Sequence, residues 1–179
     1  MTTDPKLYKE LLEAYSYAIL YGVIDKSELI VWADKIIAAD TVPDDLVIDL
    51  ALIENKAPFE ISSLISNYFS NERSQLAVRA FMGLFGKGLN IRFTPGEIIF
   101  TLYKFIDLND QLTSREEAII ANLETDIDLA MNSSYPALDQ VEQHIQDFLS
   151  VYKDFNTDNF DQWQRINDSI DQQLETLKF

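Results

Sequence analysis

Ser74-Gln-Leu-Ala-Val-Arg-Ala-Phe-Met-Gly-Leu-Phe-Gly86 is the stretch that most constrains the fold of this chain. Its apolar residues recur at spacings of three and four, as on one face of an α-helix, but Val78 and Met82 lie off that face. A helix that is apolar on most sides is normally buried. The sequence therefore predicts a central helix over 72–85, in which Gly83 allows a neighbouring element to approach closely.

The same spacing continues on both sides of this stretch, and the few Gly and Pro residues (five of each) mark the breaks. Asp4-Pro5 and Thr94-Pro95-Gly96-Glu97 read as helix starts, and Thr113 with Glu116, or Ser114 with Glu117, offers another. Besides the central helix, the pattern predicts helices around 5–22, 25–37, 46–53, 58–69, 95–106, 113–130, 138–152 and 160–177.

These helices predict an all-α fold, a single compact bundle of about nine helices or a stack of α-solenoid-like helix pairs. The chain has 179 residues, of which 47% are hydrophobic, enough for a buried core. Because no Gly/Ser-rich linker interrupts it, we expect one domain over 1–179. Within it, 1–106 would form the core and 107–179 would carry acidic helices.

The sequence predicts a cytoplasmic protein. It has no cysteine, and its N-terminus lacks the basic start and apolar run of a secretory signal. No apolar stretch approaches the roughly 20 residues that a membrane span needs.

The net charge of −16 is unevenly distributed. Between Ala121 and Asp161 there are 9 acidic residues and one basic residue, Lys153. Such a charge repels nucleic acid and anionic membranes and attracts basic proteins. We therefore expect a non-enzymatic binding protein with a basic protein partner, although solubility alone explains the charge equally well. The predicted partner-binding residues are Glu124, Asp128, Asp139, Glu142, Asp147, Asp154, Asp158 and Asp161, with Tyr135, Tyr152 or Trp163 as aromatic anchors where exposed.

No motif predicts a catalytic residue, a metal site or a cofactor. The segment from Asp154 resembles a calcium loop at positions 1, 3 and 5, but Arg165 occupies the position of the bidentate Glu, which favours a plain interhelical loop capped by Thr157 or Asp158. His144 is the only histidine, too few for zinc chemistry. Glu124, Asp126 and Asp128 read as a solvated acidic face, although an enzyme with an unrecognised carboxylate site stays an alternative.

The last predicted helix suggests a further alternative, a scaffold that self-associates. Its apolar residues follow a narrow stripe near the 3.5-residue period of coiled contacts, which suits a hairpin or a homo-oligomer. The stripe consists of Phe160, Trp163, Ile166, Ile170, Leu174 and Leu177.

Three segments in the first 55 residues carry a family resemblance: Tyr21-Gly-Val-Ile-Asp-Lys-Ser-Glu28, Trp32-Ala-Asp-Lys-Ile-Ile37 and Leu46-Val-Ile-Asp-Leu-Ala51. They resemble the start of small helical immunity-type proteins found beside bacterial secreted toxins. The resemblance implies a bacterial cytosolic protein that neutralises a toxin by binding it. It assigns no functional residues.

Overall fold

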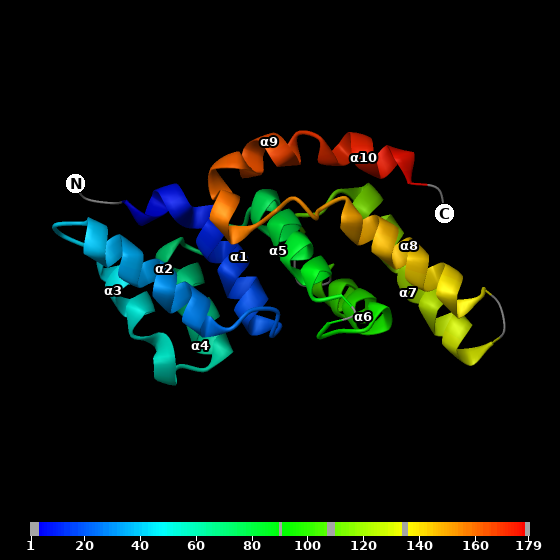
Figure 1. Cartoon of the computed structure of the whole chain (residues 1–179), viewed down its shortest axis with the longest axis horizontal. Helices are drawn as coiled ribbons and strands as arrows, with labels where there is room; N and C mark the ends of the chain where they lie inside the picture. The colour runs from blue at the N-terminus through cyan, green and yellow to red at the C-terminus, as the bar shows by residue number, and fades with distance from the viewer. Residues whose placement is uncertain (1–3, 90, 107–109, 134–135, 178–179) are drawn as a thin grey trace. The chain divides into compact units, whose positions relative to one another are not determined.

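The chain is all-α, as the sequence predicts. The computed structural model describes residues 4–89, 91–106, 110–133 and 136–177, and within these ranges it contains ten α-helices and three short 3₁₀-helices (Figure 1). Leu89 and Phe93 form an isolated bridge, and the described residues contain no strand.

Two compact units make up the fold, residues 1–77 and residues 78–179. Their boundary falls inside α5 (Gln75–Lys87) rather than at 106, where the sequence predicts the acidic part to begin. The single domain over 1–179 stays a prediction.

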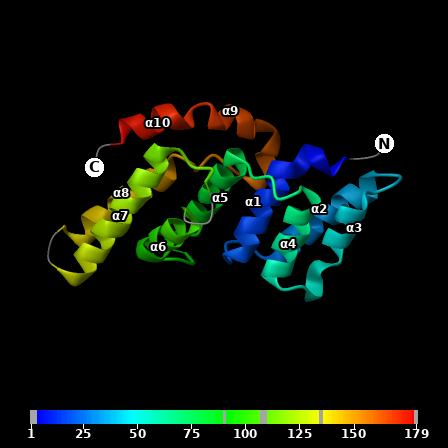
Figure 2. The ribbon, with the colours of Figure 1, turned by 180° about the vertical axis from the view of Figure 1, so that it is seen from behind.

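The first unit contains η1 (Pro5–Tyr8), α1 (Lys9–Leu20), α2 (Lys26–Ala39), α3 (Asp45–Ala51), η2 (Ile53–Asn55) and α4 (Pro58–Tyr68). Helix α1 packs against α4, and α2 packs against α3 (Figure 2). The buried side chains of this unit are mostly aliphatic, as the helical spacing predicts, and include Leu12, Leu29, Leu46, Leu50 and Ile61.

Short acidic residues fix the helix starts in this unit. Asp4 caps η1 by accepting a hydrogen bond from the Lys6 backbone N–H at 2.9 Å, with Pro5 at the first position as predicted. Asp25 caps α2 in the same way through the N–H of Ser27 at 2.8 Å. Gly22, which follows α1, has a φ of +69°, a conformation that glycine adopts without strain. These predicted boundaries are confirmed.

The second unit contains the rest of α5, then α6 (Pro95–Ile106), α7 (Ser114–Asn132), α8 (Leu138–Ser150), η3 (Thr157–Gln162), α9 (Trp163–Asn167) and α10 (Ile170–Thr176). Every residue from Val78 to Phe85 is buried, so α5 is the buried helix that its composition predicts. Helices α7 and α8 lie side by side, and α6 packs against both (Figure 1).

Gly83 has the role that the sequence predicts for it. A Cβ atom at this position would meet the carbonyl oxygen of Tyr152 and would lie 2.9 Å from the Cβ of Phe155. The missing side chain therefore lets the backbone after α8 pass directly over α5.

Both predicted capping boxes form. The Thr94 N–H donates to Glu97 Oε2 at 2.8 Å, while the Glu97 N–H donates to Thr94 Oγ1 at 3.3 Å. Thr113 and Glu116 form the same reciprocal pair at the start of α7, which selects this pair over Ser114 and Glu117.

The single helix predicted over 160–177 is wrong. The segment divides into η3, α9 and α10, and the breaks follow from its polar residues. Asn159 has non-helical backbone angles, and the Ser169 hydroxyl donates to the Ile166 carbonyl, in competition with the helical pattern. Three residues of the predicted stripe, Trp163, Ile170 and Leu174, are buried within the unit, which leaves less of the stripe for a second copy of the chain.

Candidate functional site

The eight acidic residues predicted to bind a partner all lie outside the core of the second unit. Five are exposed and three are half-buried, and they are carried by α7, by α8 and by the segment through η3. The first unit contributes none of them. On α8, Glu142 and Asp147 are five positions apart, which places them roughly 140° apart around the helix axis. The acidic segment, as we name residues 121–161, therefore presents carboxylates on more than one side of α8.

Two of these acids have a basic neighbour. Lys87, at the end of α5, donates through Nζ to the Phe155 carbonyl oxygen at 2.7 Å. Burial lowers the pKa of Lys87, and the charges of Asp158 and Asp154 oppose that effect. The charge of Lys87 partly offsets these two carboxylates, so the remaining acids of the segment carry most of the unbalanced charge.

The structure removes two of the predicted aromatic anchors. Tyr152 and Trp163 are fully buried, because each uses its ring to fill the core of the second unit. The Trp163 indole N–H donates to the Asn156 carbonyl oxygen at 2.8 Å, and Phe155 lies against the same ring edge-on. Tyr135 lies outside the described residues.

The segment that resembles a calcium loop is occupied by its own hydrogen bonds. Asn156, and not Thr157 or Asp158 as the sequence predicts, caps η3. The Asn159 side chain donates to the Asp154 carbonyl oxygen at 2.8 Å and accepts from the Asn156 N–H at 2.9 Å. Among the residues that the structure describes, no group of three or more His, Cys, Asp or Glu side chains is placed to hold a metal ion.

A buried ion pair connects the helices beneath the acidic segment. The Arg79 Nε donates to Glu116 Oε1 at 2.8 Å, and the exposed fractions of the two side chains are 1% and 0%. Arg79 also donates through Nη1 to Asn167 Oδ1 at 2.9 Å and through Nη2 to Asp171 Oδ1 at 2.5 Å. Burial alone would lower the pKa of Arg79, but its hydrogen bonds to Glu116 and Asp171 raise it.

Both oxygens of Glu116 are fully used. Oε1 also accepts from the Tyr152 hydroxyl at 2.9 Å, and Oε2 accepts from the Thr113 N–H and hydroxyl at 2.8 Å each. Burial and the charge of Glu116 raise the pKa of Tyr152 well above its usual value, so the hydroxyl remains a donor. This network joins α5, α7, α9, α10 and the turn after α8, and it fixes the framework that carries the acidic segment.

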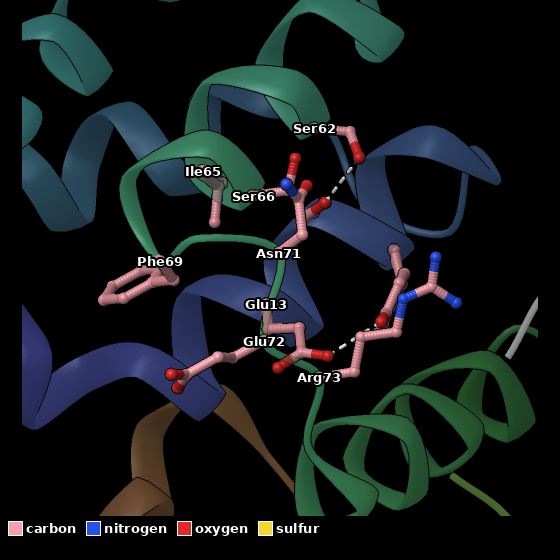
Figure 3. Close-up of a pocket in the computed structure, with 10 residues that line it drawn as sticks. Glu13, Ser62, Ile65, Ser66, Phe69, Asn71, Glu72 and Arg73 are labelled. Atoms are coloured by element: carbon pink, nitrogen blue, oxygen red, sulfur yellow. Dashed lines mark hydrogen bonds between the residues drawn. The ribbon is translucent and has the colours of Figure 1, made fainter. Parts of the chain in front are cut away.

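A polar pocket in the first unit was missed by the sequence analysis. Its volume is about 150 Å³, and it lies between α1, α4 and the turn that follows α4 (Figure 3). Its lining residues are mainly polar: Glu13, Ser16, Tyr17, Ser62, Ile65, Ser66, Phe69, Asn71, Glu72 and Arg73. The turn contains two residues with left-handed backbone angles, Ser70 at φ 55° and Asn71 at φ 59°.

Glu13 is the unusual residue of this pocket, which we call the Glu13 pocket. The residue is only 8% exposed, and Oε1 accepts from the Tyr17 hydroxyl at 2.7 Å and from the Ser74 N–H at 3.1 Å. Among the described residues, Oε2 has no hydrogen-bond partner. Burial raises the pKa of Glu13, and the bonds from Tyr17 and Ser74 only partly oppose it. In the sequence, the burial of Glu13 is indicated by its position between Leu12 and Ala14, on the buried side of the first helix.

Comparison of the chain with models of protein families, with curated proteins and with solved structures finds no match. No helix within the described ranges is long and apolar enough to cross a membrane.

Proposed function

We propose that this chain is a non-enzymatic binding protein whose acidic segment engages a basic protein. The observation that carries the proposal is the charge of residues 121–161, which hold 9 acids and one base, with all eight of the named acids outside the core. Complementary charge of this kind accelerates association and fixes the orientation of a complex.

The framework beneath these acids supports the same proposal. Holding the groups of a charged surface in fixed positions favours binding, since ordering them on binding costs free energy. The buried Arg79–Glu116 pair and its partners connect α7, which carries Glu124 and Asp128, to four other elements of the unit. The acids of α7 thus project from a helix whose packing is fixed by this network before a partner binds.

The partner class follows from the sequence resemblance described above. A toxin-neutralising immunity protein binds its toxin in the bacterial cytoplasm, and we extend the proposal to that role and that location. The alternative is that the charge serves solubility and that the helices act as a scaffold.

The test uses the protein encoded beside the gene of this chain as the probe. We expect the two proteins to form a complex, and we expect affinity to fall about tenfold or more when Asp139, Asp154 and Asp161 are all changed to Asn. A matched control changes Asp34 and Asp49 to Asn and Glu54 to Gln, which removes the same charge from exposed sites in the first unit.

Calorimetric titration at low and at high salt completes the test. Screening should weaken the native complex and have much less effect on the triple Asn variant. Equal losses of affinity for the triple variant and its control would mean that binding depends only on the net charge of the protein. The absence of any salt-sensitive complex would favour solubility as the sole role of the acids.

A further inference from the structure

The Glu13 carboxylate lacks what a buried anion normally has. Its side chain is more than nine-tenths buried, yet Oε2 has no hydrogen-bond partner among the described residues. Burying a charged oxygen without compensation is costly, so such groups are normally paired. The group that completes this site has to be a hydrogen-bond donor, because a carboxylate oxygen only accepts.

The nearest lysine does not supply that donor. Lys9, one helical turn before Glu13, places its Nζ 3.2 Å from Glu72 Oε2. Its charge lowers the pKa of Glu13, but the effect is smaller than that of burial. The bonds that Glu13 does receive come from the neutral hydroxyl of Tyr17 and from a backbone N–H. The carboxylate therefore accepts two hydrogen bonds on Oε1, whereas Oε2 is buried and accepts none from the described residues.

The space beside Glu13 is sized for a small molecule. A cavity of about 150 Å³ in other proteins holds benzene, a molecule of about six heavy atoms. Ile65 and Phe69 give the pocket an apolar wall, while Ser62, Ser66 and Asn71 give it hydroxyl and amide groups (Figure 3). The Ser16 hydroxyl donates to Ser62 Oγ at 2.9 Å, so the serine pair is already oriented.

We propose that the Glu13 pocket binds a small primary amine of about six heavy atoms or fewer, whose ammonium group donates to the Glu13 carboxylate. The ammonium group provides the missing donor together with a positive charge next to the carboxylate, whereas an alcohol provides only the donor and a carboxylate would be repelled. The hydroxyl and amide groups on the opposite side accept a second polar group of the ligand, and the short carbon chain contacts Ile65 and Phe69. This binding site is independent of the acidic segment and of the proposed partner.

The test compares two probes of equal size on the full-length protein. Ethanolamine and ethylene glycol have the same number of heavy atoms and differ in the ammonium group. In a titration near pH 8, followed by ¹⁵N amide resonances, we expect ethanolamine to give saturable shifts confined to residues around 13–17 and 62–74. We expect ethylene glycol to bind at least tenfold more weakly.

Two variants make the result specific. Glu13→Gln keeps an oxygen for the Tyr17 and Ser74 donors but removes the charge, and we expect it to lose ethanolamine affinity at least tenfold. Glu10→Gln makes the same change on the same helix outside the pocket, and we expect affinity within twofold of the native protein. Ser66→Leu should fill the pocket and abolish binding while leaving Glu13 unchanged.

Three results would overturn the proposal. Equal affinity for the two probes would show that the charge of Glu13 plays no part. Full ethanolamine binding by a folded Glu13→Gln variant would place the amine elsewhere. The absence of saturable shifts with either probe would mean that the pocket holds only water.

Discussion

Arg79 on α5 and Glu116 on α7 form a 2.8 Å ion pair that is closed to solvent on both sides. The two residues are 37 positions apart in the sequence, and the Thr113–Glu116 capping box also holds the carboxylate in place. Glu116 thus serves both as the N3 residue of a helix cap and as the counter-ion of Arg79.

Removing one partner of this pair should be far more damaging than removing both. Arg79→Met leaves Glu116 charged and buried, and we expect it to reduce the free energy of unfolding by about 3–5 kcal/mol. The double variant Arg79→Met with Glu116→Leu leaves no buried charge, so it should recover a large part of that loss. Urea denaturation of the single and double variants measures both effects.

The matched control for this prediction is Asp171→Asn. Asp171 bonds the same guanidinium, but it is 73% exposed, so water replaces its contribution and we expect a loss of about 1 kcal/mol or less. A double variant no more stable than Arg79→Met would contradict the idea that the unpaired charge is the main cost.

Gly83→Ala tests the close approach between α5 and the backbone after α8. Alanine would favour the helix by about 1 kcal/mol on propensity alone, but its Cβ would meet backbone atoms that cannot rotate away. We therefore expect a net loss of about 2 kcal/mol or more in the free energy of unfolding.

Gly96→Ala is the control for that variant. Gly96 lies in the first turn of α6, and an added Cβ would lie 3.7 Å from the nearest atom, Ile127 Cγ1, which is an ordinary contact. Its stability should stay equal or rise by up to about 1 kcal/mol. A stable Gly83→Ala protein would show that the segment 152–155 moves more easily than its burial indicates.

The sequence predicted those features that local rules determine. The apolar composition of α5 indicated its burial, the Thr-x-x-Glu patterns indicated two helix starts, and Gly83 indicated a close approach. Features that depend on distant partners were not predictable in this way. Nothing near Arg79 in the sequence shows that Glu116 and Asp171 will meet it, and nothing near Glu13 indicates a pocket.

The last helix shows the limit of periodicity. The spacing of its apolar residues is correct, and Trp163, Ile170 and Leu174 are indeed buried. The spacing of apolar residues does not show that the helix is interrupted at Asn159 and Ser169. A kinked helix that keeps one side toward the core has the same apolar spacing as a straight helix.

The turn after α4 offers a test of backbone strain beside the Glu13 pocket. Ser70 has a φ of 55°, a conformation that costs a residue with a side chain about 1 kcal/mol. Ser70→Gly should therefore stabilise the chain by about 0.5–1 kcal/mol, measured as a shift in the urea midpoint. Ser63→Gly, in the exposed interior of α4, should destabilise by about 0.5 kcal/mol. If both variants changed the free energy of unfolding in the same direction, the result would contradict the strain assigned to Ser70.

Glu13 should also make stability depend on pH in the opposite direction from a salt-bridged carboxylate. Burial raises its pKa above the ordinary 4.5 in the folded chain. Between that ordinary value and the raised one, the folded protein binds more protons than the unfolded protein, so this residue lowers stability as pH rises through the window. The charged or titratable groups around it are Lys9, Glu10, Tyr17, Glu72 and Arg73. All of them are native in the comparison of Glu13→Gln with the native protein, and only the control changes Glu10.

Glu13→Gln removes this one titration. We expect the variant to be about 1 kcal/mol more stable than the native protein at pH 8. This advantage should shrink as the pH falls toward and below 4.5, because the native carboxyl is protonated in both states only below its unfolded pKa. Urea unfolding across this range measures the difference, and Glu10→Gln serves as the control. Saturating ethanolamine should raise the stability of the native chain alone, because a ligand stabilises only the state that binds it. A variant that is less stable at every pH would mean that the Glu13 charge is already compensated within the fold.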